Sequence, residues 1–169
     1  MAVKIPIFLS APSVINPAQQ EVYDFVVGAL AEENLQPRSL GRSDFPQSDP
    51  LTEVYYLVRA CYGGIILGFA QVDVTTGILK KGTPVEKSIA GEMRIATPWN
   101  QIEAGMLHAL RKPLMAFCEQ GVSGGIFDRG SLQGFVQPFA PGAVTGHDWE
   151  QIRERVRIFS SDVRKSFRS

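Results

Sequence analysis

The chain has 169 residues, of which 44% are hydrophobic and 20% are charged, and these proportions are typical of one globular domain covering residues 1–169. A domain of this size buries a core that needs no metal or disulfide for its stability. The 17 Lys and Arg residues balance the 17 Asp and Glu residues. This balance argues against a nucleic acid or a membrane held by long-range charge, and it leaves room for a small anionic ligand.

The first part of the chain predicts a strand, a helix and a second strand. Residues 3–10 form a β-rich run, and Asn16, Pro17 and Gln19 then supply the N-cap, first-turn proline and capping-box partner of a helix start. The predicted core face of this helix has the spacing of an amphipathic helix: Val22, Phe25, Val26, Ala29 and Leu30. Residues 35–40 are then expected to form a short strand.

The next segment predicts a second helix and a strand buried on both faces. A polar loop over residues 41–49 ends at Asp49 and Pro50, which begin the helix. Its predicted core face comprises Leu51, Val54, Tyr55, Val58 and Cys61. The run at 63–69 is apolar throughout, which is typical of a central strand in a parallel sheet.

Residues 72–98 interrupt this pattern. They alternate weakly and carry glycines, so we expect a hairpin or a mobile flap rather than another core unit. A third helix is predicted from Thr97–Pro98 to about residue 111, followed by a buried strand at 114–118. One or two closing strands are expected within 124–139. A last helix begins at His147, and its apolar face comprises Trp149, Ile152, Val156, Phe159 and Val163.

Strands and helices that alternate at least four times predict an α/β fold with a parallel sheet and helices on both faces. Right-handed crossovers leave few topologies, and a flavodoxin-like five-stranded parallel sheet fits the length best. Ligands bind such sheets beyond the carboxyl ends of the strands. The loops at those ends are therefore the places to look for a site.

The loops that follow the predicted strands carry small and hydrogen-bonding residues. Ser10 follows the first strand, Arg42 and Asp44 follow the second, and Gln71 follows the third. Arg42 beside Asp44 either holds a phosphate or sugar hydroxyl or forms a solvated loop pair. None of these loops matches a dinucleotide glycine fingerprint or a Walker phosphate loop, and Ser10 lacks the GxSxG pattern of serine hydrolases.

The third predicted helix is apolar on nearly every side, so we expect it to be buried between layers. Glu103 lies in its middle. An unpaired buried carboxylate has a raised pKa and costs stability, so Glu103 should have a partner or face a cleft. It is either a nucleophile or acid/base at a ligand pocket, or a structural residue, that is, an Arg-paired core glutamate or part of a surface ridge.

Two neighbours of Glu103 are candidate ligand contacts. Trp99 either stacks on a nucleobase or nicotinamide, with Asn100 as a polar handle, or is simply buried. His108 stands in an apolar stretch and is interpreted as a core residue rather than a general base, and the sequence shows no metal-ligand spacing.

A family resemblance appears at this helix. The segment Trp-Asn-Gln-Ile-Glu-Ala-Gly-Met-Leu-His-Ala-Leu-Arg-Lys-Pro-Leu-Met, at 99–115, resembles the part of nucleoside 2-deoxyribosyltransferases that carries their catalytic Glu. The runs at 7–12 and 64–69 look like the first and third strands of that family. The chain also resembles the broader group of TIR-like domains, which share a flavodoxin-like sheet and often a catalytic Glu that cleaves nicotinamide from NAD. The resemblance covers roughly residues 4–118.

The chain departs from the deoxyribosyltransferase pattern just before Glu103. That family usually has an Asp and a Gly-Thr pair there, whereas this chain has Thr-Pro-Trp-Asn-Gln, and its own Gly82–Thr83 pair lies well upstream. Only Glu103 is therefore carried over from the family. TIR-like domains normally lack both the Pro-Trp-Asn helix start and the insert at 72–98, so the resemblance does not determine the identity of the substrate.

Two functions are compatible with these observations. The first is an enzyme that cleaves or transfers the N-glycosidic bond of a nucleoside or nucleotide, in which Glu103 attacks or stabilises the anomeric carbon. This chemistry requires no metal and no redox cofactor. The enzyme is a hydrolase if water accepts the sugar, and a transferase if a second base accepts it. The alternative is a non-catalytic module for nucleotide sensing or oligomerisation, which the missing aspartate favours.

Further expectations concern the site's surroundings and partners. We expect a pocket formed by Ser10, residues 42–44, Gln71 and the start of the third helix, covered by a flap at 72–98. We also expect a homo-oligomer, in the simplest case a dimer, because the resembled family builds its sites at subunit contacts and because the helix faces at Trp149 and Phe159 need cover. Residues 153–168 carry six basic and two acidic side chains, which form a partner surface or a solvated helix face.

The sequence also suggests a compartment. Cys61 and Cys118 stand in apolar runs and are expected to be buried small hydrophobes. The first apolar run is shorter than that of a signal peptide, and no stretch reaches 18 apolar residues. We therefore expect a cytoplasmic protein that binds a small molecule and neither nucleic acid nor membrane.

Overall fold

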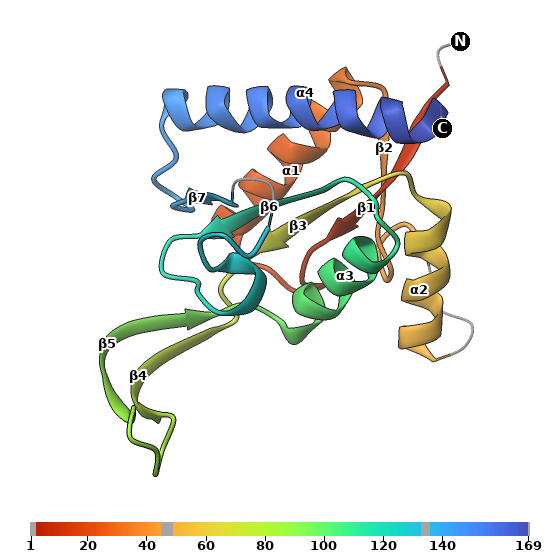
Figure 1. Cartoon of the computed structure of the whole chain (residues 1–169). Coiled ribbons are helices and arrows are strands. Elements are labelled where there is room, and N and C mark those ends of the chain that lie inside the picture. Colours follow the sequence, from red (N-terminus) through yellow and green to blue (C-terminus); the bar gives the residue numbers. More distant parts are fainter. Residues whose placement is uncertain (1–2, 45–48, 133–135, 169) are drawn as a thin grey trace.

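Five strands lie side by side in one parallel sheet (Figure 1), as seen in a computed structural model that describes residues 3–44, 49–132 and 136–168. The strand order is β2-β1-β3-β6-β7, and all neighbouring pairs are parallel. The strands are Ile5–Ser10 (β1), Leu35–Arg38 (β2), Gly64–Gly68 (β3), Leu114–Glu119 (β6) and Val136–Phe139 (β7). The expected flavodoxin-like α/β fold is confirmed.

The helices begin at the capping residues that the sequence predicts. Asn16 accepts a hydrogen bond from the backbone N–H of Gln19, and the Gln19 side chain accepts one from Asn16, which completes the capping box. Asp49 and Thr97 cap the next two helices, and each is followed by proline at the first helical position. The helices are Pro17–Glu32 (α1), Pro50–Ala60 (α2), Pro98–Ala109 (α3) and Gly146–Arg168 (α4).

The helices cover the sheet in two layers. Apolar side chains of α1 and α4 pack on one face, and those of α2 and α3 pack on the other. At β3 the second layer approaches very closely, because a Cβ at Gly64 would lie 2.3 Å from Leu107 Cδ1 of α3. Cys61 and Cys118 lie in this layer as free buried thiols, as predicted, and burial raises the pKa of both to about 11.

The predicted core face of α2 is correct for Val54, Val58 and Cys61 and wrong for two residues, and the predicted burial of α3 is wrong. On α2 the buried side chains are Val54, Leu57 and Val58, whereas Leu51 and Tyr55 are exposed. The apolar spacing fits either arc of this short helix, and packing on the sheet selects one of them. Helix α3 is not buried between layers: one side packs on the sheet, and Ile102 on the other side is 40% exposed.

The later part of the chain decides between one and two closing strands and corrects the expectation that Trp149 and Phe159 need cover from another chain. The segment at 124–130 contains the 3₁₀ turn Gly125–Phe127 (η1) rather than a strand, so the described part of 124–139 contributes only β7. Phe159 is buried, and Trp149 packs its ring on Phe25 of α1 at a centroid distance of 4.4 Å. These two α4 side chains are therefore covered by other residues of this chain.

No helix in the described part is long and apolar enough to cross a membrane.

Residues 72–98 contain a hairpin, one of the two predicted alternatives. Strands Val72–Leu79 (β4) and Lys87–Ile95 (β5) pair antiparallel in a separate two-stranded sheet. We call this hairpin the arm. It projects away from the body rather than folding over the carboxyl end of the large sheet (Figure 1), so the expected flap over the site is wrong for this conformation.

Candidate active site

Three polar side chains meet at the carboxyl end of β1. Along this strand, Ile7 and Leu9 face the layer of α1 and α4, so Ser10, like Phe8, points to the opposite layer. Asn100 and Glu103 stand three residues apart on α3, which puts them on the same side of the helix. The fold thus brings Ser10, Asn100 and Glu103 together, as the position of Ser10 at a strand end predicted.

The three side chains form a directed hydrogen-bond chain. Asn100 Nδ2 donates to Ser10 Oγ at 2.7 Å, and the Ser10 hydroxyl donates to Glu103 Oε2. Because Asn100 occupies Ser10 Oγ as a donor, the single hydroxyl hydrogen of Ser10 is directed to the carboxylate. Asn100 Oδ1 is buried without a hydrogen-bond partner.

Burial controls the charge of Glu103. Ser10 is 2% exposed, Asn100 is fully buried and Glu103 is 9% exposed. Loss of solvent raises the pKa of Glu103 from its ordinary value of 4.5 to about 7, and the hydrogen bond from Ser10 opposes part of this rise. Within the described residues Glu103 bonds a hydroxyl, and no salt bridge to an Arg or Lys is found. Glu103 is therefore not an Arg-paired glutamate, and this structural interpretation of the residue is wrong.

The predicted pair of Arg42 and Asp44 does not form. Arg42 donates to the backbone oxygen of Pro12 at 2.9 Å and lies over the Tyr23 ring at 4.4 Å, so it stays beside the loop that follows Ser10. Asp44 is instead paired with Arg38, whose Nε is 2.9 Å from Asp44 Oδ2, and this contact lowers the pKa of Asp44. Asp44 is therefore already neutralised by an arginine.

Two of the predicted site residues, Gln71 and Trp99, are exposed rather than buried with Glu103. Gln71 directly precedes the arm; its backbone N–H donates to the Ile95 carbonyl oxygen, and its exposed side chain donates to the Ala70 oxygen. Trp99 is 39% exposed, so it is not simply buried. His108 is exposed at the last turn of α3 rather than in the core.

Sequence reasoning missed a second buried carboxylate, Glu119, at the carboxyl end of β6. Glu119 Oε2 accepts hydrogen bonds from Gln19 Nε2 at 2.8 Å and from the Ala70 backbone N–H at 2.9 Å. Its Oε1 lies 3.3 Å from Arg94 Nη1 of β5, and Arg94 also reaches Asp73 of β4. The available signal was a charged residue closing an apolar strand; Gln19 was interpreted only as a capping residue.

The carboxyl end of the sheet also holds a cavity of about 630 Å³ beside β6. Its lining includes Glu119, Val122, Phe127, Arg129 and Pro138 and does not include Glu103. No group of three or more His, Cys, Asp or Glu side chains in the described part of the chain is placed to hold a metal ion.

Comparisons with known proteins bear on the fold. No protein-family model and no curated protein matches this chain. Among solved structures, a metal-soaked flavodiiron core from Synechocystis sp. PCC6803 is similar, with a TM-score of 0.55 and 11% sequence identity. The match covers 98% of this chain and 37% of that chain, so this chain spans little more than a third of its length. At this identity the likeness shows the fold alone.

Proposed function

We propose that this protein cleaves or transfers the N-glycosidic bond of a nucleoside or nucleotide, with Glu103 as the catalytic carboxylate. The observation that supports this proposal is a buried carboxylate at the carboxyl end of a parallel sheet, held by a hydroxyl, with a pKa raised to about 7. Raised pKa values of this kind cluster at functional sites. The sequence resemblance to nucleoside 2-deoxyribosyltransferases and TIR-like domains assigns the same residue.

The chemistry follows from the state of this carboxylate. When ionised, a Glu103 oxygen attacks the anomeric carbon of the sugar, and the bond from that carbon to the base nitrogen breaks. The base leaves with the bonding electrons and takes up a proton. Water or a second base then attacks the same carbon and releases Glu103, giving hydrolysis or transfer.

The surrounding residues have proposed supporting roles. Ser10 and Asn100 orient the carboxylate through their hydrogen-bond chain. Trp99 offers an exposed ring to a base, and Arg42, fixed beside the loop after β1, offers a cation to a phosphate or sugar hydroxyl. Gln71 stays a proposed contact at the margin, whereas the ion pair of Asp44 with Arg38 leaves it little capacity to bind a ligand. We further propose that the protein acts in the cytoplasm as a homo-oligomer.

Glu103→Gln tests the proposal. Purified protein is incubated with deoxynucleosides, ribonucleosides, nucleotides and NAD, and released base is measured by chromatography. Because the substitution keeps size and hydrogen-bonding reach but removes the charge, we expect wild-type protein to release base and the variant to be slower by roughly 100-fold or more. Glu21→Gln, which removes an exposed carboxylate of α1, is the matched control and should keep full activity.

The assay also separates the two functions. Binding of a nucleotide by wild-type protein without release of base from any substrate would support the sensing module instead. Equal base release by wild type and Glu103→Gln would remove Glu103 from the mechanism.

A further inference from the structure

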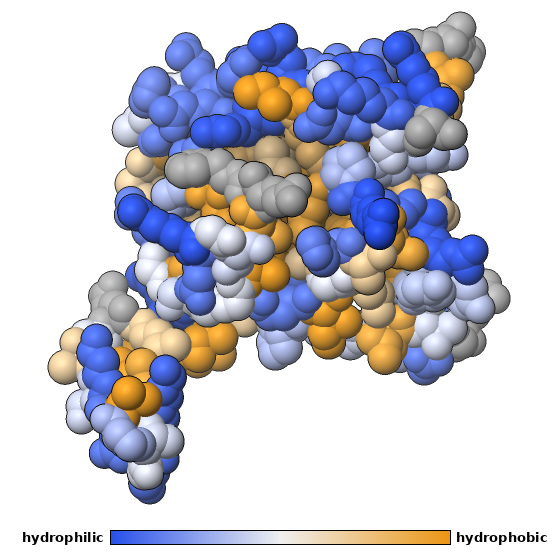
Figure 2. Space-filling view, viewed as in Figure 1, coloured by the Kyte–Doolittle hydropathy of each residue, from blue (hydrophilic) through white to orange (hydrophobic). Residues whose placement is uncertain are grey.

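The arm carries an apolar face that this chain does not cover. Two cross-strand pairs, Val72–Ile95 and Val74–Met93, are apolar on both strands and share one face, because residues two apart on a strand point the same way. Val72 is 52% exposed and Ile95 is 37% exposed. Figure 2 shows apolar residues gathered within the arm.

This apolar face continues toward the tip. A Cβ at Gly77 would lie 3.1 Å from Ile89 Cδ1 and 3.6 Å from Val74 Cγ1, so these two side chains gather over the glycine. The strands of the arm contact one another far more than any other described element. An isolated two-stranded hairpin is only marginally stable in water, so a face of this kind is stabilised when another surface covers it.

The base of the arm is fixed, which keeps the face away from the body. Arg94 of β5 donates to Gln120 O at 3.2 Å and pairs with Glu119, and its backbone N–H donates to Gly121 O at 3.2 Å. The Ser123 N–H in turn donates to the Arg94 carbonyl. These bonds join both the backbone and the side chain of one β5 residue to the loop after β6. The arm is therefore held outward, in reach of another molecule.

The same chain offers a second uncovered apolar surface, which we call the receiving surface. It lies on the neighbouring helices α2 and α3 and consists of exposed side chains: Leu51, Tyr55, Tyr56 and Ile102. Tyr55 and Tyr56 contact edge to face at 5.7 Å, which makes a continuous aromatic part of this surface. Figure 2 shows hydrophobic residues at the lower margin of the body, in the region where Figure 1 places α2 and α3.

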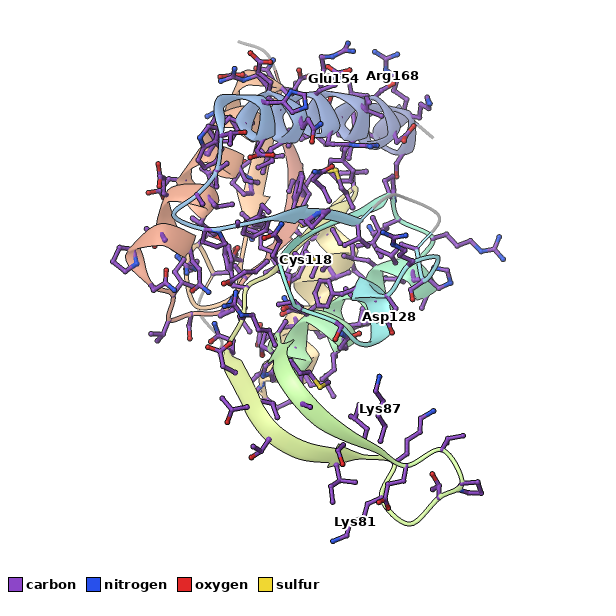
Figure 3. The ribbon with its side chains drawn as sticks, turned by 90° about the vertical axis from the view of Figure 1, so that its left-hand side faces the viewer. Lys81, Lys87, Cys118, Asp128, Glu154 and Arg168 are labelled. Carbon is purple, nitrogen blue, oxygen red and sulfur yellow. The ribbon has the colours of Figure 1, made fainter. Side chains whose placement is uncertain are left out.

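Charges of opposite sign lie at the end of the arm and at the first turn of α2, while Arg59 lies over the Tyr55 ring of the receiving surface at 5.7 Å. The end of the arm carries three lysines, Lys80, Lys81 and Lys87, and Figure 3 shows Lys81 at its tip and Lys87 nearer the body. The first turn of α2, beside Leu51, carries Asp49 and Glu53. An arm laid on the receiving surface of another copy can thus bring lysines toward carboxylates.

We propose that the arm of one copy docks through its apolar face on the receiving surface of a second copy, and that the two copies do this reciprocally about a two-fold axis. Such an arrangement closes, because each copy contributes one arm and one receiving surface. β4 has 8 residues, and at the usual strand dimensions one face of the arm covers roughly 250 Å². Two arms on two receiving surfaces bury roughly 1,000 Å², which is the lower limit for a biological interface.

The first test is the mass of the full chain in solution. Sedimentation velocity over a range of micromolar concentrations should show a species of twice the 18.6 kDa chain mass. Ile89→Glu adds a charge to the apolar face and should weaken dimerisation by roughly tenfold or more. Ser88→Glu adds the same charge at the adjacent residue, which points to the opposite face, and should leave dimerisation within about twofold of wild type.

The second test locates the contact. Ile102→Glu on α3 should weaken dimerisation as Ile89→Glu does, whereas Ala109→Glu at the exposed end of the same helix should not. A carbodiimide should join lysines of the arm to Asp49 or Glu53 of the other copy in a mixture of isotopically labelled and unlabelled chains. This readout does not depend on how the Ile89 variant folds.

Defined results would overturn the inference. A monomer at all concentrations, dimerisation equally sensitive to Ser88→Glu and Ile89→Glu, or crosslinks within single chains only would each do so. Stable association of the arm with lipid vesicles or with a different protein in place of dimerisation would give the face another occupant. None of these measurements uses base release, so the interface and the proposed function succeed or fail separately.

Discussion

Ser10 links the fold to the chemistry of a single carboxylate. It is the last residue of a buried strand, and strand alternation turns its hydroxyl toward α3 rather than toward α1 and α4. Its hydrogen bond lowers the pKa of Glu103 against the larger effect of burial, which raises it. A strand-end serine thereby keeps a mostly desolvated carboxylate available in its ionised form near neutral pH.

Removing that hydroxyl gives a prediction with a definite sign. In Ser10→Ala the hydrogen bond to Glu103 is lost, so burial acts unopposed and the pKa of Glu103 rises further. If ionised Glu103 is the nucleophile, the rise of kcat/KM with pH moves to higher pH, and activity at pH 7 falls by roughly tenfold. A pH series of base release from pH 5 to 9 measures this shift.

A conservative variant is the control for this prediction. Ser10→Thr keeps a hydroxyl at the same position and should restore much of the wild-type pH profile. Asn100→Ala removes the donor that orients Ser10 and should move the profile in the same direction as Ser10→Ala, by less. A Ser10→Ala profile with its midpoint unchanged and only its height reduced would contradict a role for Ser10 in the ionisation of Glu103.

At the scale of elements, the sequence predicts what depends on local residues. Caps such as Asn16 and Asp49 and the apolar strand at β3 are local signals, and the corresponding elements form as expected. The exposed position of Tyr55 could not be predicted, because its helix has two apolar arcs and only the sheet selects between them. The direction of the arm depends on the contact of Arg94 with Glu119, 25 residues away in the chain.

The candidate site was likewise predictable in part, and the rest of its geometry depends on packing. Ser10 and Glu103 could be predicted as neighbours, because strand ends and the loops and helices that follow them gather at one edge of a parallel sheet. Their direct hydrogen bond, and the Asn100 side chain that orients it, depend on how closely α3 approaches β1. That distance is set by packing, which no local pattern encodes.

The close packing of α3 on β3 can be tested with two glycines. Gly64→Ala places a Cβ 2.3 Å from Leu107 Cδ1, so the helix or the leucine must move, and we expect a loss of about 1–3 kcal/mol of stability. Gly105→Ala on the exposed side of α3 meets no atom within 4 Å and should gain about 0.5–1 kcal/mol from helix propensity. Urea denaturation measures both, and a Gly64→Ala protein as stable as Gly105→Ala would contradict the close approach.

At the scale of the whole molecule, charged side chains of the body form local ion pairs, whereas the end of the arm gathers three lysines. Several basic residues of α4 pair with acidic neighbours, as in the pairs Arg153–Glu32, Arg164–Glu33 and Lys165–Asp162. This arrangement agrees with a solvated helix face, which was one of the two interpretations of the basic C-terminal segment. Glu103 stands outside this pattern, because it is buried and bonds a hydroxyl.

The pH dependence of global stability should therefore carry the signature of Glu103. Its pKa is about 7 in the folded chain and near 4.5 in the unfolded chain, so between these values the folded state binds more protons and stability falls as pH rises. The loss is complete above about pH 7 and amounts to about 3 kcal/mol at most. As pH falls, carboxylates with lowered pKa values, such as Asp44, lose their contribution to folding stability below about pH 4.

We thus expect stability to be greatest near pH 5 and to decline toward pH 8, as measured by urea denaturation across this range. In Glu103→Gln the titrating group is absent, so the decline between pH 5 and pH 8 should be much smaller and the variant should be more stable than wild type at pH 8. Glu21→Gln should keep the wild-type pH dependence. A Glu103→Gln protein that is less stable than wild type at pH 8 would mean that the carboxylate stabilises the fold as an ion, and would count against a buried group held in readiness for catalysis.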